Sequence, residues 1–178
     1  MTTSLGSLIE RGDKYRCIYA DPPWPYANQV TRSATGLHYP SMSLHDIVAL
    51  PIAALAHDSA HLHLWTTNAF LPYAFHVIEA WGFEYKSVLV WIKPTIGIGN
   101  YWRVSHEFLL LGVRGSCPFL DHGYRSWVER KRSAHSVKPI VIRKMVETVS
   151  PGPRLELFGR RVADGWTVWG NQIRKTLL

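Results

Sequence analysis

The chain places a short apolar run, Tyr15-Arg16-Cys17-Ile18-Tyr19-Ala20, directly before the segment Asp21-Pro22-Pro23-Trp24. The apolar run predicts a buried strand. Pro22 and Pro23 fix their own φ angles and have no N–H, so the backbone after the strand is stiff and presents carbonyl oxygens without competing donors. Asp-Pro-Pro is also an ordinary way to end a strand and begin a turn, and the tetrapeptide by itself leaves both interpretations open.

The chemistry that suits this segment is the binding of an amino group. Asp21 offers a carboxylate acceptor beside backbone carbonyls, and an exocyclic amine such as the 6-amino group of adenine offers two N–H donors. Trp24 and Tyr26 are candidate rings to cover the face of a base. For methyl transfer to such an amine, Asp21 would orient the nitrogen and stabilise the positive charge that grows on it as the new bond forms.

Composition limits the class of protein. The 178 residues, 47% hydrophobic and 19% charged, fit one globular domain over residues 1–178, with residues 1–14 as an N-terminal lead-in. The formal net charge is +7 and the pI is about 9.6. A basic balance of this size favours a polyanionic partner such as nucleic acid.

Cysteine usage and hydropathy indicate the expected compartment. Cys17 and Cys117 lie far apart in unlike contexts, so neither a disulfide framework nor a cysteine metal site is predicted. The first residues lack a basic start followed by an apolar core, and no apolar run is long enough to cross a membrane. We therefore expect a cytoplasmic protein that does not insert into a membrane.

Apolar runs alternate with helical patterns along the chain, which predicts an α/β layered domain. Helices are expected over residues 43–50, 51–56 and 69–81, the last capped by Asn68. A further helix begins at Pro139 and is expected to bury Ile140, Val141, Met145, Val146 and Val149. Strands are expected over residues 15–20, 61–66, 86–92, 107–113, 154–159 and 166–169.

Two long irregular segments interrupt these elements, at residues 25–42 and 114–135, and their length predicts functional loops. The second segment is basic, and Trp127 lies among its charges. The cluster can be a solvated loop or a phosphate contact. Its members are Arg125, Arg130, Lys131 and Arg132.

Other patterns allow less specific conclusions. His61 and His63 share one face of a strand, but no cysteine or carboxylate pattern accompanies them, and no metal site is predicted. Gly97-Ile98-Gly99-Asn100 does not match a dinucleotide fingerprint and predicts a flexible loop. Three tryptophans fit core or rim positions as well as stacking platforms, depending on where they lie relative to Asp21: Trp65, Trp91 and Trp102.

Three later segments make the Asp21 segment more specific. They are His135-Ser136-Val137-Lys138-Pro139, Arg154-Leu155-Glu156-Leu157-Phe158-Gly159-Arg160 and Gly165-Trp166-Thr167-Val168-Trp169-Gly170-Asn171-Gln172. Together with Asp21-Pro22-Pro23-Trp24, and in this order, they resemble the MT-A70 family. That family contains the catalytic subunit of the eukaryotic mRNA adenosine methyltransferase and many bacterial and phage adenine methyltransferases. The resemblance spans about residues 15–172.

The resemblance implies a single Rossmann-like methyltransferase domain that uses S-adenosyl-L-methionine. Its mostly parallel twisted sheet would be flanked by helices, with the catalytic motif placed before the main cofactor-binding segment. Asp21, Pro22, Pro23 and Trp24 would hold the target amine. The Lys138 ammonium would complement the carboxylate of the cofactor. The other cofactor-binding residues implied are Ser136, Arg160, Asn171 and Gln172, and the expected substrate-binding residues are Tyr26, Tyr39, Arg125, Arg130, Lys131 and Arg132.

Departures from the family pattern favour a compact DNA-modifying type. Arg161-Val162-Ala163-Asp164 lacks the His-Asn pair that the mRNA enzyme carries after its Phe-Gly-Arg, and only fourteen residues precede the first strand. We expect methylation of the 6-amino group of adenine in DNA, by a chain that acts alone, as a homodimer or with a partner chain. The alternatives are the same reaction on RNA adenosine and a nucleic-acid-binding relative without catalytic activity.

Overall fold

The fold is built around one seven-stranded sheet with strand order β5-β3-β4-β2-β1-β6-β7. The computed structural model describes residues 4–25, 41–97, 101–132 and 137–170. Four of the six strand pairings are parallel, and the two that involve β4 are antiparallel. The strands are β1 Tyr15–Ala20, β2 Ala56–Thr66, β3 Glu84–Ile92, β4 His106–Arg114, β5 Trp127–Glu129, β6 Arg154–Leu157 and β7 Trp166–Trp169.

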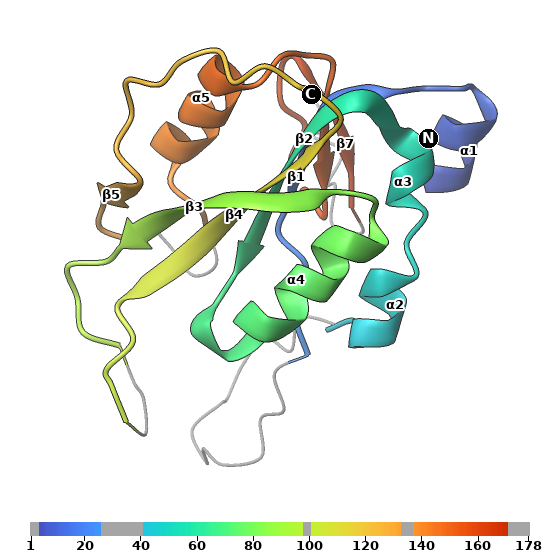
Figure 1. The fold of residues 1–178 in the computed structure, drawn as a ribbon. Helices are drawn as coiled ribbons and strands as arrows, with labels where there is room; N and C mark the ends of the chain where they lie inside the picture. Colours follow the sequence, from blue (N-terminus) through green and yellow to red (C-terminus); the bar gives the residue numbers. More distant parts are fainter. Residues whose placement is uncertain (1–3, 26–40, 98–100, 133–136, 171–178) are drawn as a thin grey trace, which may run out of the picture.

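Helices cover both faces of the sheet, as Figure 1 shows. One face carries α5 (Ile140–Val149), and we call it the α5 face. The opposite face carries α1 Leu5–Glu10, α2 Leu44–Val48, α3 Ile52–Leu55 and α4 Leu71–Ala80, the last preceded by the 3-10 turn η1 Asn68–Phe70. The predicted α/β class, with a mostly parallel sheet between helices, is confirmed.

The interior strand β1, which lies between β2 and β6, shows why the layers form. Ile18 and Ala20 point into the core beneath the α1 to α4 layer. Cys17 and Tyr19 alternate with them and belong to a second apolar cluster beneath α5. Because side chains alternate between faces along a strand, a run that is apolar on both faces must lie between two covering layers.

Several boundaries differ from the sequence predictions. Asn68 does not cap an α-helix: it begins η1, and the α-helix begins at Leu71, where Pro72 fits a first turn that needs no N–H. In α5, Ile140 is 66% exposed. The buried stripe is instead Ile142, Met145, Val146 and Val149, the spacing of one helix face.

Two elements were not predicted at all. The helix α1 lies within the expected N-terminal lead-in and buries Leu5 and Leu8, with Ser4 accepting a hydrogen bond from Ser7 N at its start. The strand β5 lies within the expected loop 114–135 and pairs with the end of β3. Six and three residues are too few to show a clear period in the sequence.

Candidate active site

Asp21 follows the carboxyl end of the interior strand β1. β1 pairs in parallel with β2 on one side and β6 on the other. The chain leaves β1 through α2 and α3 on one face of the sheet and reaches β6 from α5 on the opposite face (Figure 1). In open α/β sheets, ligands bind outside the carboxyl ends of the strands where the winding reverses in this way. Asp21 therefore stands where the topology places a ligand site.

Lys138, which lies just before α5, is the direct partner of Asp21. Its Nζ donates hydrogen bonds to both carboxylate oxygens, each at 2.8 Å. The exposed fractions of the two side chains are 15% for Lys138 and 30% for Asp21. The structure therefore brings together two residues that the sequence suggested for separate tasks, one for the amine and one for the cofactor.

Glu107 and Lys93 extend this ion pair into a network of two acids and two lysines. Lys138 Nζ lies 3.2 Å from Glu107 Oε2, and Lys93 Nζ donates to the other carboxylate oxygen of Glu107. Glu107 was missed as a site residue because it opens the apolar run of β4 and was read as part of that strand. The signal was present, since a lone carboxylate and Lys93 occupy the ends of two adjacent strands at the edge where β1 ends.

The charges of this network stabilise one another. Burial by itself would lower the pKa of Lys138, but Asp21 and Glu107 outweigh that effect and raise it. Burial would raise the pKa of Glu107, but Lys138 and Lys93 bring it below its ordinary value. An opposite charge nearby favours the ionised form of each group. Lys138 is therefore an ammonium and Glu107 a carboxylate at neutral pH.

Aromatic side chains lie beneath the two lysines. Lys138 Nζ is 5.2 Å from the ring centroid of Trp65, and Lys93 Nζ is 4.7 Å from that of Trp91. Trp65 is fully buried and Trp91 is 2% exposed, and Trp65 Nε1 donates to the hydroxyl of Tyr19 at 2.6 Å. These two tryptophans are core residues that attract cations, not open stacking platforms.

Trp24 does not take the role expected from the sequence. Its side chain is 5% exposed, its ring stacks on Phe70 at a centroid distance of 5.5 Å, and its Nε1 donates to the carbonyl of Trp65 at 3.1 Å. The interpretation of Trp24 as a ring over the base is replaced by a packing role. The sequence alone does not show whether an aromatic residue that follows Asp-Pro-Pro faces a ligand or the core.

The prolines hold the turn after β1. Pro22 O accepts a hydrogen bond from Trp24 N, and Pro23 O accepts one from Met42 N, both at 2.9 Å. The second bond joins Pro23 to Met42, which lies just before Ser43, the N-cap residue of α2. The backbone carbonyls next to Asp21 are thus already fixed in direction before any ligand arrives.

The carboxyl ends of β6 and β7 form a second, closely packed part of this edge. Gly159 N donates to Trp169 O at 3.0 Å, and a Cβ added at Gly170 would lie 2.1 Å from Gly159 O. Phe158 lies between the end of β6 and Gly159. Its φ of 62° is a left-handed conformation that is uncommon for a bulky residue. Glycine is thus required where these two strand ends meet.

These residues fit the S-adenosylmethionine suggested by the sequence resemblance. The Lys138 ammonium matches a carboxylate, and it lies against Asp21 at the edge of the sheet where the topology places a ligand. Arg160 follows Gly159 and is exposed. Five other predicted site residues lie outside the described residues: Tyr26, Tyr39, Ser136, Asn171 and Gln172.

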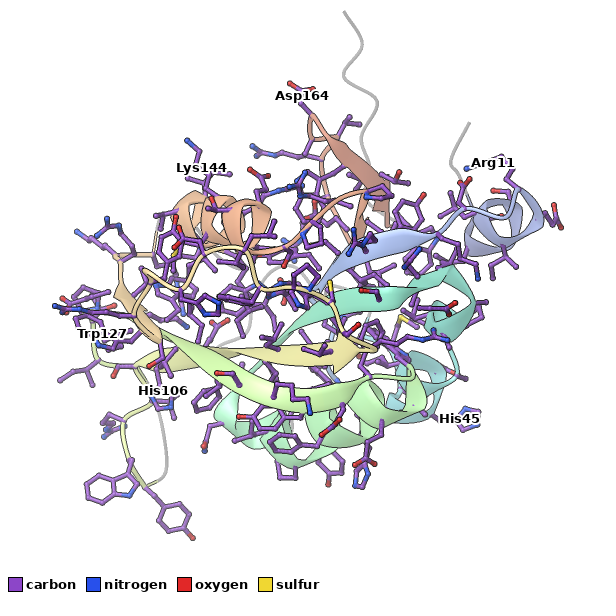
Figure 2. All side chains as sticks on the ribbon, turned by 45° about the horizontal axis from the view of Figure 1, so that its top comes forward. Arg11, His45, His106, Trp127, Lys144 and Asp164 are labelled. Carbon is purple, nitrogen blue, oxygen red and sulfur yellow. The ribbon has the colours of Figure 1, made fainter. Side chains whose placement is uncertain are left out.

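The basic cluster divides between two places. Arg130 N donates to Ile92 O, and Arg130 O accepts from Trp91 Nε1, so Arg130 is held beside Lys93 at the Asp21 edge. Lys131 and Arg132 follow and are exposed. Arg125 instead stacks over Trp127 at 5.6 Å and lines a cavity farther along the sheet. Figure 2 shows Trp127 and His106, the first residue of β4, on the same side of the molecule.

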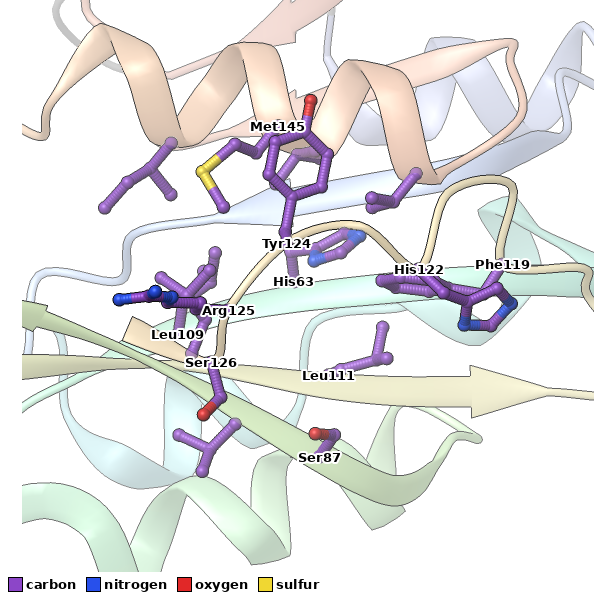
Figure 3. A pocket seen from close by; sticks show the side chains of 15 residues that line it. His63, Ser87, Leu109, Leu111, Phe119, His122, Tyr124, Arg125, Ser126 and Met145 are labelled. Atoms are coloured by element: carbon purple, nitrogen blue, oxygen red, sulfur yellow. The ribbon is translucent and has the colours of Figure 1, made fainter. Parts of the chain in front are cut away.

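That cavity has a volume of about 220 Å³ and lies between α5 and strands β3 and β4 (Figure 3). Its lining is mostly apolar and includes Leu109, Leu111 and Met145, with His63 on the sheet side. Asp21 and Lys138 do not line it. The cavity is therefore separate from the network described above.

His61 and His63 share one hydrogen-bond partner on the α5 face. Ser150 Oγ lies 2.9 Å from His61 Nδ1 and 2.8 Å from His63 Nε2. Burial lowers the pKa of His61 and brings that of His63 to about 3. Among residues 4–25, 41–97, 101–132 and 137–170, no group of three or more potential metal ligands occurs. The two histidines therefore act as neutral core residues joined through Ser150.

Comparison with known proteins finds a family model and similar proteins that agree on the family of this chain. The family model described as MT-A70 matches residues 15–172. The Type II methyltransferase M.MunI of Mycoplasma sp is 30% identical over 182 residues, which cover 90% of this chain and 78% of that protein. No helix in the described parts of the chain is long and apolar enough to span a membrane.

Two human proteins are similar over a smaller share of their length. The N(6)-adenosine-methyltransferase catalytic subunit METTL3 is 29% identical over 174 residues, covering 90% of this chain but 28% of that protein. The N(6)-adenine-specific methyltransferase METTL4 is 29% identical over 191 residues, covering 94% of this chain and 39% of that protein. The chain thus corresponds to most of the bacterial relative and to one part of each human relative.

Proposed function

The chain belongs to the MT-A70 family, whose methyltransferases depend on S-adenosylmethionine, and we propose that it methylates the 6-amino group of adenine in DNA. The family supports adenine N6 methylation. The observation that carries the proposal is the network at the end of β1. In it a carboxylate that can accept an amine and an ammonium that can bind a carboxylate are 2.8 Å apart.

The residues divide the work as follows. S-adenosylmethionine supplies an electrophilic methyl group and a carboxylate at its amino-acid end. Lys138 binds that carboxylate, while Glu107 remains paired with Lys93. Asp21, relieved of part of its interaction with Lys138, accepts an N–H of the adenine amine.

Asp21 orients the amine and stabilises the transition state. The amine nitrogen becomes positive as its bond to the methyl carbon forms, and a carboxylate held at 30% exposure interacts with that charge more strongly than with the neutral amine. The methyl group would leave the sulfonium sulfur, which becomes a neutral thioether, and replace one hydrogen of the amine, whose proton leaves to solvent. The carbonyls of Pro22 and Pro23, fixed by their hydrogen bonds to Trp24 and Met42, add dipoles beside it.

DNA is favoured by the extent of the similarity. A bacterial Type II methyltransferase is covered over 78% of its length. The segment Arg161-Val162-Ala163-Asp164 departs from the pattern of the mRNA enzyme. The exposed residues Lys131 and Arg132, beside the Asp21 edge, supply positive charge for phosphates. In duplex DNA the adenine must leave the base stack to reach Asp21, at a cost of about a few kcal/mol.

The test supplies S-adenosylmethionine with a labelled methyl group to three nucleic acids: duplex DNA, single-stranded DNA and RNA. We expect label on N6 of adenine in DNA, identified after enzymatic digestion to nucleosides. Asp21→Asn should lose the activity, whereas Asp13→Asn, a change at an aspartate on the surface turn before β1, should keep it.

The outcomes separate the parts of the proposal. Label on RNA alone would replace DNA by RNA as the substrate. Label on cytosine, or on no nucleic acid, would refute adenine methylation. Full activity of Asp21→Asn would remove Asp21 from the mechanism even if adenine is the product.

A further inference from the structure

Two aromatic side chains stand almost fully in solvent on the connection between β3 and β4. Tyr101 is 95% exposed and Trp102 is 91% exposed. Each of the other tryptophans is 42% exposed or less. Large aromatic side chains are ordinarily buried for most of their area, and exposed ones concentrate at binding surfaces. We call Tyr101 and Trp102 the aromatic tip.

The connection that carries the aromatic tip is closed at its base. Lys93 N donates to Ser105 O at 2.7 Å. The side chains of Lys93 and Glu107 form an ion pair at the same end of the connection. Farther out, Gly97 lies so close to Val104 that an added Cβ would be 2.1 Å from its carbonyl oxygen. The two arms of the connection therefore meet twice before the chain reaches Tyr101 and Trp102.

The base of this connection belongs to the candidate active site. Glu107 contacts Lys138, which contacts Asp21. Trp102 precedes Glu107 by five residues, and five residues of extended chain span at most about 17 Å. Because successive nucleotides of a strand rise by about 3.4 Å, this reach corresponds to about five nucleotides. The aromatic tip can thus contact the bases next to the one that Asp21 holds.

We propose that Tyr101 and Trp102 stack on bases that flank the target adenine and so hold the nucleic acid open at the active site. The inference rests on the proposed function. Any base offers a flat face, so stacking on such rings tolerates many sequences. An inserted ring can also occupy the space in a strand from which a base has been withdrawn.

A nucleic acid is favoured over a second copy of this chain as the occupant. Two copies would each bring a net charge of +7, and like charges oppose their approach. A polyanion is attracted by the same charge.

The experiment measures binding of a short DNA duplex and of the matching single strand to the full chain by filter retention. Trp102→Ala and Tyr101→Ala should each weaken binding by about 5- to 150-fold, the range known for loss of one stacked base. Trp102→Phe, which keeps a flat ring, should recover most of the affinity. Tyr85→Ala is the matched control, since Tyr85 is 39% exposed at the opposite end of β3.

Salt dependence separates stacking from charge. Trp102→Ala should weaken binding equally at low and high salt, whereas Lys131→Ala should reduce the slope of log affinity against log salt by about one. Calorimetry of S-adenosylmethionine binding should give the same affinity for Trp102→Ala as for the unaltered chain.

Two results would overturn the inference. In the first, the unaltered chain methylates adenine, but the double variant Tyr101→Ala, Trp102→Ala binds DNA with unchanged affinity. The other is a change from dimer to monomer in sedimentation without a change in DNA affinity, which would assign the aromatic tip to a protein partner. If the unaltered chain methylates no adenine, the proposed function fails, whatever the binding data show.

Discussion

Lys138 donates from one ammonium to both carboxylate oxygens of Asp21, at 2.8 Å each, although 117 residues separate them in the chain. The contact links the expected amine site to the expected cofactor site. Lys138 already contacts the carboxylates of Asp21 and Glu107. One ammonium cannot hold a third carboxylate without weakening these contacts, so an anion bound by Lys138 leaves Asp21 freer to accept a donor. This coupling is the basis of the first two predictions.

Replacing Asp21 by Asn keeps the shape of the side chain and removes its charge. We expect the methyl-transfer rate to fall by about 100-fold or more, the loss seen when one preorganised electrostatic group is removed from an active site. The rate is measured in single turnover with cofactor in excess. The affinity for S-adenosylmethionine should stay the same or increase, because Lys138 is no longer paired with a charged Asp21. A loss of this affinity larger than the loss of rate would contradict the role assigned to Asp21.

Replacing Lys138 by Met keeps most of the side-chain volume and removes the cation. S-adenosylmethionine affinity should fall by roughly 10- to 100-fold, since hydrogen bonds to charged groups contribute about 1.5–3 kcal/mol. Calorimetry measures it directly. Lys144→Met is the control, because Lys144 lies on the exposed side of α5, the helix that follows Lys138 (Figure 2). Equal affinities for both variants would remove Lys138 from the cofactor site.

Glu107→Gln tests the charge balance of the network. It should lower the free energy of unfolding at pH 7 by about 1–3 kcal/mol, because Lys93 and Lys138 lose a charged acceptor. The pKa of Glu107 is lowered in the folded state. The ionised Glu107 therefore adds to the free energy of unfolding above pH 4.5, the pKa of a glutamate in the unfolded chain. This stabilisation is lost as the pH falls through the lower pKa of Glu107 in the folded protein. Urea melts between pH 3 and 7 should show the variant less sensitive to acid; an unchanged acid slope would contradict this.

His63 should make the fold sensitive to acid in a second, higher window. Burial brings the pKa of His63 to about 3 from an ordinary value of 6.5. Between these values the unfolded chain binds a proton that the folded chain does not, so stability falls as pH drops from 6.5 toward 3. His63→Gln should flatten that part of the curve and keep a polar partner for Ser150. His57→Gln, at an exposed histidine of the same strand, should leave it unchanged.

Gly170→Ala should damage the edge where β6 and β7 end. The added Cβ would lie 2.1 Å from Gly159 O and 3.0 Å from the carbonyl carbon of Phe158, so the backbone must move. We expect a loss of about 1–3 kcal/mol, the usual range for overpacking, measured by urea unfolding. In Gly6→Ala the added Cβ has 3.7 Å to its nearest neighbour. That variant should be neutral or more stable, since Ala favours the helix.

The sequence was informative wherever a local rule applied. The strand at Tyr15–Ala20 matched the observed β1 because an apolar run stopped at Asp21, and Ser43 was correctly placed at the start of α2. The fold class and the family could be predicted because four sequence motifs occur in the order typical of the family. Residues that act through local pattern are visible without a structure.

The contacts between motifs were not visible. Nothing in the spacing of Asp21 and Lys138 says that they touch, because the contact depends on α5 crossing to the same edge of the sheet. Glu107 was hidden in an apolar strand, and Trp24 was assigned to a ligand because its burial depends on Phe70, 46 residues away. Long-range packing decides such cases, and a single sequence does not encode it in any short pattern.

The tryptophans beneath the lysines give the site an optical property. The colour of light that an indole emits follows the electric field across its ring, and the ammonium groups of Lys138 and Lys93 lie 5.2 and 4.7 Å from the centroids of Trp65 and Trp91. A ligand that draws either ammonium away changes that field. The chain has eight tryptophans, so the difference in ultraviolet-excited emission between the unaltered chain and a Trp65→Phe variant should report when Lys138 leaves Asp21.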